Sequence, residues 1–573
     1  MPLFPFIGLL AILLALPVSD AVAARARDEL PAVTYNPLEL PSFNATVQRV
    51  QRALIEAGYY KGEADGAFNE QTDKAIRTYQ RRERLPQTGI ADEALAIHIE
   101  TSAKVQSLLK QLQRQRLSKM DEARAALLAR PETRDLVTDP DQRQKRATPE
   151  RDPTECFADP APKCLLDEAS QSAIAIFKNE LRDWALGEIL VAEAKAGLVG
   201  EAMDTVRLIG DPRLVMVALR DIATAQASAG RPVEALAAAE IIPDAVKRLE
   251  ALAAIAAIQA KKNDLEGAQE TAQLLLDGLV EIDDSLKRVS LASGTLSILT
   301  QAGKTKIAER ELDKIREMAR AEEDPTHRSA ALRHLASALA ESGKPDQALA
   351  ILKDLPDVSE RTPVLVSAAA AQARAGHAEQ AILTAQTIKA VRYRAVVLTR
   401  IALAQKKSGD RAGGRNTLDA ALQAASTIKR PFAKAYAYER IALALMEIDG
   451  LKEGRNFDQA IDTAILISDD KLRAQTLWTL ATGQRMAGDG PGADETMALA
   501  ETATAEIKSP FTRVWMFSEI ALNHLSADRE QSAWAAFNRA LGIAEGIDGA
   551  WGRARALARL ASTLSELSEY VKK

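Results

Sequence analysis

Residues 248–263, RLEALAAIAAIQAKKN, carry a pattern that returns along the second part of the chain. A basic residue is followed seven positions later by Ile or Leu, and eight positions after that by Gly, Asn or Asp. Clear copies begin at Arg182, Arg248, Arg394, Lys434, Arg473 and Arg513, and weaker ones at Arg288, Arg328 and Arg361. Apolar residues at helical spacing followed by a stop residue predict a helix that ends in a turn.

A second helix is predicted after each stop, because alanine recurs five positions beyond it. These alanines are Ala202, Ala235, Ala268, Ala308, Ala348, Ala381, Ala493 and Ala533. Successive stops lie 33 or close to 40 residues apart. The extra seven residues are about two helical turns, so the longer units can lengthen one helix and keep the same face inward. The pattern therefore predicts about ten helical hairpins in residues 165–573.

This array resembles a tetratricopeptide-type solenoid, whose units place Leu-Gly or Leu-Ala in the first helix, Gly at the turn and Ala in the second helix. The insertion GLKEGRNFD at residues 450–458 disturbs one unit. Aromatic residues make up only 4% of the chain, which fits an all-α protein. The resemblance implies a curved surface whose concave face binds proteins or peptides.

The recurring basic residue opposes the helix dipole, so the fold must compensate for it. In five units an aspartate four residues earlier can cap the helix and pair with the cation. These aspartates are Asp244, Asp284, Asp324, Asp357 and Asp469. One interpretation is a structural ladder, in which each Arg caps the neighbouring unit or pairs with that aspartate. The other is an exposed basic row that captures acidic peptides or anionic wall polymers.

Three units have no such aspartate, and their basic residues are the candidates for partner binding. They are Arg394, Lys434 and Arg513. Aromatic residues accompany them in YRAVVL, FAKAYAYER and FTRVWMF, and Tyr438 and Trp515 are taken as further partner-binding candidates. Packing in the core is the alternative role of these aromatic rings.

A different pattern occupies residues 47–92. Val47, Val50 and Leu54 share one helical face, and Gly58 is placed to end that helix. Asn69 can cap a second helix, and Asp92 a third one. In chain order the hallmarks are Leu54, Gly58-Tyr59, Gly62, Asp65-Gly66-Phe68, Thr72, Ala75-Ile76, Tyr79-Gln80, Leu85-Pro86 and Thr88-Gly89 with Asp92.

These hallmarks resemble the helical peptidoglycan-binding domain that accompanies many bacterial wall enzymes. The resemblance covers residues 44–100 and implies a three-helix module that binds peptidoglycan in a shallow groove without catalytic residues of its own. Tyr59, Tyr60, Asp65 and Gln80 are its candidate contact residues. A core or turn role is the alternative for each, and turn chemistry is favoured for Asp65.

The beginning of the chain has the pattern of an export signal. An uncharged apolar run is followed by Ala21-Val22-Ala23, which predicts a cleaved signal peptide over residues 1–23. Because no Lys or Arg precedes the run, an uncleaved anchor is the alternative. Residues 24–43 are then predicted to be a linker.

Between the two patterned regions we predict a helix over residues 101–130 and a disordered spacer over residues 131–163, where charges and prolines are dense. Cys156 and Cys164 are the two cysteines of the chain. In an exported protein such a close pair predicts a disulfide.

Composition and motifs do not indicate catalysis or nucleic-acid binding. The net charge of −5 lacks the basic excess of a nucleic-acid binder. The five histidines show no zinc-ligand spacing, and neither a nucleophile elbow nor a phosphate-binding glycine loop is found. We therefore expect a protein that is not an enzyme and has no metal or cofactor.

Together these patterns predict an exported periplasmic adaptor. Its module would hold peptidoglycan, and its array would recruit periplasmic protein partners, with no membrane span after signal cleavage. One alternative is a wall hydrolase or lytic transglycosylase with an unrecognised active site in the array. Another is a structural wall-linking protein without a specific partner.

Overall fold

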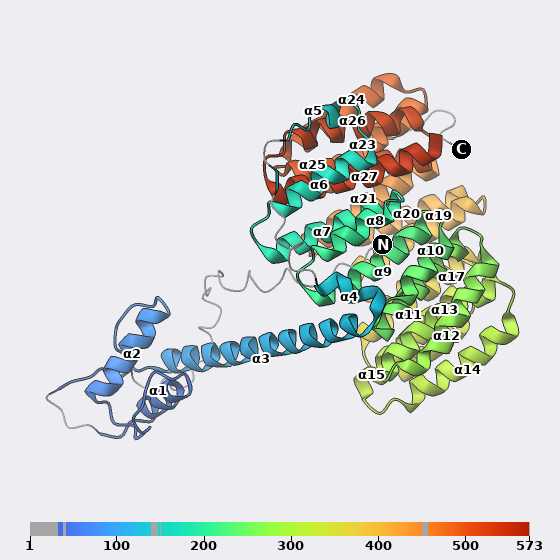
Figure 1. Ribbon diagram of the computed structural model, residues 1–573. Helices are drawn as coiled ribbons and strands as arrows, with labels where there is room; N and C mark the ends of the chain where they lie inside the picture. Colours follow the sequence, from blue (N-terminus) through green and yellow to red (C-terminus); the bar gives the residue numbers. More distant parts are fainter. Residues whose placement is uncertain (1–31, 38–41, 139–146, 149–150, 450–456, 572–573) are drawn as a thin grey trace. The chain divides into compact units, whose positions relative to one another are not determined.

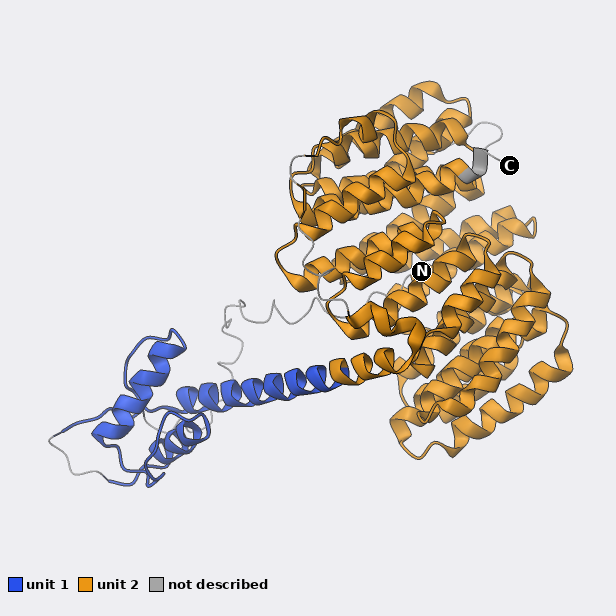
Figure 2. Ribbon diagram, viewed as in Figure 1, with its two compact units in different colours: residues 1–119 blue, residues 120–573 orange. Residues whose placement is uncertain are grey.

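The computed structural model describes residues 32–37, 42–138, 147–148, 151–449 and 457–571. The predicted signal peptide and part of the predicted linker lie outside the described residues. The chain divides into two compact units, residues 1–119 and 120–573 (Figure 2). The described elements are helices, which confirms the predicted all-α class. None of the described helices combines the length and apolar character that crossing a membrane requires.

The first unit contains α1 (Ala45–Glu56), α2 (Glu70–Arg82) and the beginning of α3 (Glu93–Ala129) (Figure 1). The predicted helix signals are confirmed. Gly58 ends α1 with a φ of +79°, the side chain of Asn69 accepts from the Thr72 amide at 2.9 Å, and that of Asp92 accepts from the Leu95 amide at 2.7 Å. Local capping thus sets the end of α1 and the beginnings of α2 and α3.

Helix α3 is longer than the predicted third helix, because it continues without a break into the predicted helix over residues 101–130. Val105, Leu108 and Leu112 form an apolar stripe on this helix that could pack on the module. Val105, Leu108 and Leu112 are instead 49–56% exposed, so this part of the stripe is not covered.

The described residues of the second unit contain eleven helical hairpins, each with an A helix and a B helix. The A helices are α7 (Asn179–Lys195), α9 (Pro212–Ser228), α11 (Ala245–Lys261), α13 (Ser285–Gln301), α15 (Pro325–Glu341), α17 (Val358–Arg374), α19 (Val391–Lys407), α21 (Pro431–Asp449), α23 (Asp470–Met486), α25 (Pro510–Ser526) and α27 (Ala550–Val571). Ten B helices follow their A helix in the chain: α8 (Val199–Arg207), α10 (Pro232–Glu240), α12 (Leu265–Gly278), α14 (Thr305–Ala321), α16 (Pro345–Ala350), α18 (Ala378–Gln386), α20 (Arg411–Ser426), α22 (Asp458–Ile465), α24 (Gly490–Glu506) and α26 (Glu530–Glu545). Short 3-10 helices, η2 (Leu279–Glu281) and η3 (Ile351–Asp354), extend α12 and α16.

The predicted stop residues, with the exception of Asp449, adopt the left-handed conformation that ends a helix, whereas Asp449 is the last residue of α21. Gly197, Gly230 and Gly409 have positive φ values, and so do the non-glycine stops Asn263 and Asp528. The longer units lengthen one helix, as predicted, and the structure shows that it is the B helix: α8 and α18 have 9 residues in the short units, whereas α14 and α24 have 17 in the long ones. The alanines five positions beyond the stops are buried between paired helices.

The array closes on itself. Each A helix packs against the A helix before and after it, and α27 also packs against α7. The eleventh B helix is α6 (Pro162–Ile174), which precedes the first A helix in sequence but packs on the last one (Figure 1). The last hairpin is thus completed by a helix from the other end of the unit. The sequence predicted about ten hairpins and gave no signal of this closure.

Charged and aromatic side chains join the two ends. The Arg555 guanidinium donates to both carboxylate oxygens of Glu188, at 2.7 and 2.8 Å. It also stacks 4.6–4.8 Å from the rings of Trp184 and Trp551, which meet edge to face. The side chain of Arg555 is only 8% exposed. We call this group the closure seam.

The disulfide between Cys156 and Cys164 is confirmed, with an S–S distance of 1.98 Å. It joins α5 (Thr154–Ala158) to α6. The predicted disordered spacer over residues 131–163 is wrong in its described parts, since α4 (Pro131–Thr138) and α5 lie there. Leu136 and Val137 are buried in the core, and so is Phe157. These three apolar side chains can hold the two short helices in place, because they pack against apolar side chains that the hairpins already provide.

Inside several hairpins a glutamine of the A helix accepts from a threonine of the B helix. Such pairs are Gln259 with Thr271, Gln372 with Thr384, and Gln405 with Thr417, at 2.7–2.8 Å. In the first hairpin Glu193 takes the glutamine position and accepts from Thr205 at 3.1 Å. Burial raises the pKa of Glu193 from 4.5 to about 7.

We predict that Glu193→Gln removes a pH-dependent loss of stability. Because the folded-state pKa lies above that of the unfolded chain, the protonated form is favoured in the fold, and stability falls as pH rises from about 4.5 to 7. The variant should match the wild type at pH 4.5. At pH 8 it should have the higher free energy of unfolding, by up to about 3 kcal/mol. Chemical denaturation at both pH values measures this, and an equal difference at both would contradict it.

We predict that Arg555→Ala weakens the closure seam and lowers the free energy of unfolding by about 2–4 kcal/mol, because Glu188 loses a nearly buried partner. Denaturation followed by tryptophan fluorescence reports on the seam directly. Arg485→Ala is the matched control, since Arg485 pairs with Asp494 on the surface, and its effect should stay below about 1 kcal/mol. Equal small effects of both substitutions would contradict the role of the seam.

Candidate functional site

A buried glutamine fixes the loop between α1 and α2. The side-chain nitrogen of Gln51 lies 3.0 Å from Asp65 Oδ1, 3.0 Å from the Ala67 carbonyl oxygen and 3.1 Å from Thr72 Oγ1. Its side-chain oxygen accepts from the Gly66 amide at 2.8 Å. Gly66 has a φ of +75°, which favours glycine. The loop that carries Asp65 is therefore held in one shape.

Two of the four predicted contact residues are largely buried. Tyr60 and Gln80 are each 5% exposed. The Tyr60 hydroxyl accepts from Thr72 at 3.4 Å. The Gln80 amide donates to Thr88 Oγ1 at 2.9 Å, and its oxygen accepts from the Gly89 backbone at 3.0 Å. Both side chains hold loops in place.

The other two contact candidates reach the surface. Tyr59 is half-buried, with its ring edge-on to Tyr79 at a centroid distance of 5.2 Å. Asp65 is exposed, and hydrogen bonds from the Ala67 backbone and from the Gln51 side chain lower its pKa. At neutral pH it therefore presents a carboxylate, while Tyr59 leaves part of its ring exposed beside Arg82, whose guanidinium lies 5.7 Å from the ring centroid.

The sequence interpretation missed Gln51 and Arg49. Arg49 of α1 forms ion pairs with Glu93 and Glu100 of α3, the latter at 2.7 Å, and so ties the third helix to the first. Polar residues on an amphipathic helix carry no periodic signal of their own, so their partners could not be identified from spacing.

In the ring, the recurring basic residues cap the preceding helical segment. Their guanidinium groups donate to a main-chain carbonyl six residues earlier, where a helix end leaves acceptors unpaired. These bonds join Arg248 to Ile242, Arg328 to Glu322, Arg361 to Leu355, Arg394 to Ile388, Arg473 to Ile467 and Arg553 to Ile547, at 2.8–3.4 Å. The capping part of the predicted ladder is confirmed for these units.

The predicted aspartates act as N-caps. Asp244, Asp284, Asp324 and Asp469 each accept from a backbone amide three residues on, and Asp357 makes no such side-chain bond. In two units the Arg instead pairs with a glutamate 33 residues further along. Arg248 pairs with Glu281 at 2.5 Å, and Arg473 pairs with Glu506.

The predicted partner-binding residues lie on three A helices, α19, α21 and α25, and do not form one cluster. Lys434 donates to the Ser426 carbonyl at 3.0 Å and lies 5.8 Å from the centroid of the Tyr438 ring. Tyr438 is 6% exposed and packs in the core. Its ring therefore has the role that the alternative interpretation gave it.

On α25, Arg513 is half-buried, and its Nε atom has no hydrogen-bond partner among the described residues. Trp515 is also half-buried. Its indole donates to Glu519 at 2.8 Å, and the Arg559 guanidinium stacks on its ring at 4.7 Å. Its ring also meets Phe511, which in turn contacts Trp551 of the closure seam.

Arg394 faces a cavity. A hollow of about 540 Å³ lies over α19 between α18 and α20. Its lining residues are Ile382, Gln386, Arg394, Leu398, Asn416, Thr417, Ala420, Gln423, Ala424 and Thr427. Arg394 is the single charged residue among them. The cavity thus combines an apolar floor with amide and hydroxyl groups and one cation.

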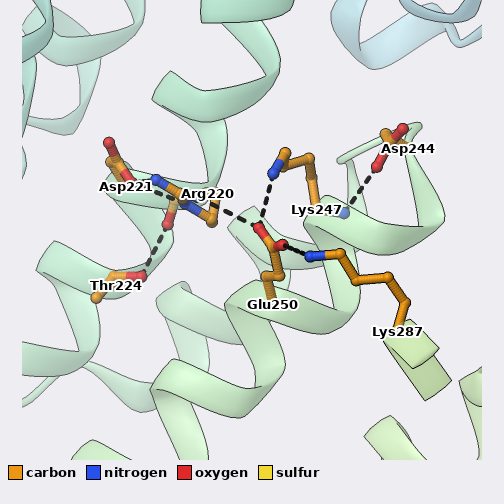
Figure 3. A network of polar contacts seen from close by, with 7 residues as sticks. All are labelled: Arg220, Asp221, Thr224, Asp244, Lys247, Glu250 and Lys287. Atoms are coloured by element: carbon orange, nitrogen blue, oxygen red, sulfur yellow. Dashed lines mark hydrogen bonds and ion pairs between the residues drawn. The ribbon is translucent and has the colours of Figure 1, made fainter. Parts of the chain in front are cut away.

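A polar network links α9, α11 and α13 (Figure 3). Glu250 lies at its centre and accepts from Lys247 at 2.8 Å, Arg220 at 3.3 Å and Lys287 at 3.4 Å. Burial opposes ionisation of Glu250, but the bond from Lys247 and the three positive charges lower its pKa overall. Each of its cations is therefore paired with an acidic side chain within the ring. Arg394 lacks a comparable neighbour, as no described acidic side chain forms an ion pair with it.

Comparison with known proteins supports the module. Residues 44–96 match the family model described as "Putative peptidoglycan binding domain". No curated protein matches the chain. Two solved structures show distant similarity: Ton1535 from Thermococcus onnurineus NA1 (18% identity, 56% of this chain and 98% of that chain, TM-score 0.26) and a circular tandem repeat protein with novel repeat topology and enhanced subunit contact surfaces (14% identity, 72% and 90%, TM-score 0.13). These TM-scores assign neither fold nor function.

Proposed function

We propose that this protein is an exported, wall-associated adaptor: its module binds peptidoglycan and its ring recruits protein partners. The observation that carries the proposal is the family match over residues 44–96, which coincides with a module whose loops are fixed by Gln51 and Gln80. The residues that reach its surface suit the binding of a glycopeptide and include no arrangement indicative of catalysis. The proposed location is the periplasm, after removal of residues 1–23.

In the module we assign ligand contact to Tyr59 and Asp65. An aromatic face packs on the apolar side of a sugar ring, and a carboxylate accepts hydrogen bonds from hydroxyl or amide groups. Tyr60 and Gln80 have a positioning role, because their side chains are buried and hold the loops around the surface. The module thus binds its ligand without changing it.

The ring supports the second half of the proposal. A closed array of hairpins presents large helical surfaces, and it also leaves cations that its own acidic residues do not neutralise. Anchoring such a surface to the wall raises the effective concentration of any partner there, so that recruitment requires no catalytic step. We therefore propose a binding role for the ring and no enzymatic activity.

Co-sedimentation of the full-length mature protein with purified sacculi tests the proposal. The wild type should sediment, and Tyr59→Ala/Asp65→Ala should bind about tenfold more weakly, since it loses an aromatic contact and a charged acceptor. Arg52→Ala, an exposed change on α1, is the matched control and should bind like the wild type.

The supernatant of the same assay is analysed for soluble muropeptides. Their absence is expected of an adaptor. Release of muropeptides by the wild type would overturn the non-enzymatic assignment in favour of a wall hydrolase or transglycosylase. Undiminished binding by Tyr59→Ala/Asp65→Ala would overturn the assignment of the contact residues.

A further inference from the structure

One sector of the ring carries a strong positive charge although the whole chain has a net charge of −5. Residues 380–434 contain only two acidic residues, Asp410 and Asp419, and eleven basic ones. The basic residues are Lys389, Arg392, Arg394, Arg400, Lys406, Lys407, Arg411, Arg415, Lys429, Arg430 and Lys434. This sector covers most of α18, then α19, α20 and the start of α21. Such a concentration of one sign attracts ligands of the opposite sign.

The charge gathers where B helices end and the next A helices begin. Lys406 and Arg415 are neutralised by Glu447 and Asp449 near the other end of these helices. Six cations in the two loops and the first turns that follow them form no ion pair with any described residue. We call them the basic edge: Lys389, Arg392, Arg394, Lys429, Arg430 and Lys434. Because α19 and α21 pack side by side, the two loops are neighbours.

Arg394 connects the basic edge with the cavity. In two other hairpins the equivalent Arg is paired with a glutamate 33 residues on, namely Glu281 and Glu506. The residue 33 positions after Arg394 in the sequence is Thr427, which lines the cavity. Among the described residues, the guanidinium makes one hydrogen bond, to the Ile388 carbonyl at 3.3 Å. A guanidinium can donate five hydrogen bonds, so a carboxylate from outside can take the place that the ring's own glutamate occupies elsewhere.

We propose that the cavity and the basic edge bind an acidic segment of a partner protein. A carboxylate of the segment pairs with Arg394, a neighbouring apolar side chain enters the cavity against Leu398 and Ala424, and further acidic residues lie along the edge. Gln386 and Gln423 offer amide groups that match a peptide backbone. This inference rests on the proposed adaptor function and specifies its partner site.

The features of the cavity favour a peptide over an anionic membrane surface. Lipid headgroups of a bilayer would contact the exposed cations of the basic edge. A flat bilayer surface would not fill an apolar cavity that is lined with side-chain amides. Two exposed aromatic residues, Tyr393 (42% exposed) and Phe432 (68%), stand on the same edge and add apolar contact for a bound chain.

The decisive variant is Thr427→Glu in the full-length protein. It installs the glutamate that Arg248 and Arg473 already have, so the internal ion pair should form and exclude the ligand carboxylate. Thr427→Gln has nearly the same shape without the charge and is the matched control. Lys306→Gln on α14, an exposed cation far along the sequence from the edge, controls for general charge effects. Circular dichroism and thermal unfolding check that each variant is folded.

The probe is a short fluorescein-labelled peptide rich in Glu and Asp with a central Leu, compared with its Gln/Asn analogue. The wild type should bind the acidic peptide in a salt-dependent manner and not its analogue. Thr427→Glu should weaken binding about tenfold or more, and by more than Thr427→Gln, which fills the same space in the cavity without the charge. Lys306→Gln should stay within about twofold of the wild type. No binding by the wild type, or equal binding by Thr427→Glu, overturns the proposal.

Two further arms separate other outcomes. Vesicles of phosphatidylglycerol that sediment with the wild type but not with Thr427→Glu, without any peptide binding, would replace the acidic segment by a membrane surface and overturn the proposal. Sacculi binding is measured on the same preparations and should be unchanged in Thr427→Glu. If the wild type binds the peptide but not sacculi, the wall function fails and the acidic-segment site stands.

Discussion

The packing of α27 against helices from both ends of the array is the interaction on which the ring depends. On one side it contacts α25 and α26, and on the other side α6 and α7. Arg555 and Glu188, which meet there, are separated by 367 positions in the chain. Closing so long a loop costs conformational entropy, which grows only slowly with length. The burial of Leu557, Leu560 and Leu567 on α27 offsets that cost.

Closure of the array removes the need for capping repeats at its ends. An open array of repeats exposes an apolar face at each end and requires polar capping repeats. In the ring every A helix has two A neighbours, so the array presents no terminal face. The disulfide stands next to the closing helix and holds α5 on α6. The segment before the first hairpin therefore takes part in the fold rather than acting as a spacer.

Helices and their ends could be predicted because each depends on residues that are close together in the sequence. Gly58, Asn69 and the stop residues of the hairpins act through local backbone geometry, which spacing reveals. Closure could not be predicted, since α6 carries no copy of the marker pattern and its partner is α27 at the far end of the chain. Gln51 was missed for a similar reason, because its hydrogen bonds join three separate segments.

In the candidate sites too, the sequence predicted local features but not contacts between distant segments. The sequence predicted Arg394 as a partner-binding candidate because its unit lacks the capping aspartate, and the structure places it in a cavity. It could not show that Thr427 stands where two other hairpins have a glutamate, because that relation emerges only from the ion pairs. Function is expected at positions where one repeat lacks a local interaction that other repeats have.

Hydrogen–deuterium exchange of the full-length protein tests the closed ring most directly. If α6 completes the last hairpin, the amides of residues 162–174 exchange as slowly as those of α27, and both helices exchange faster together in Arg555→Ala. If the amides of α6 exchange at the rate of an unstructured chain while α27 stays protected, the array is open and the account of its closure is contradicted.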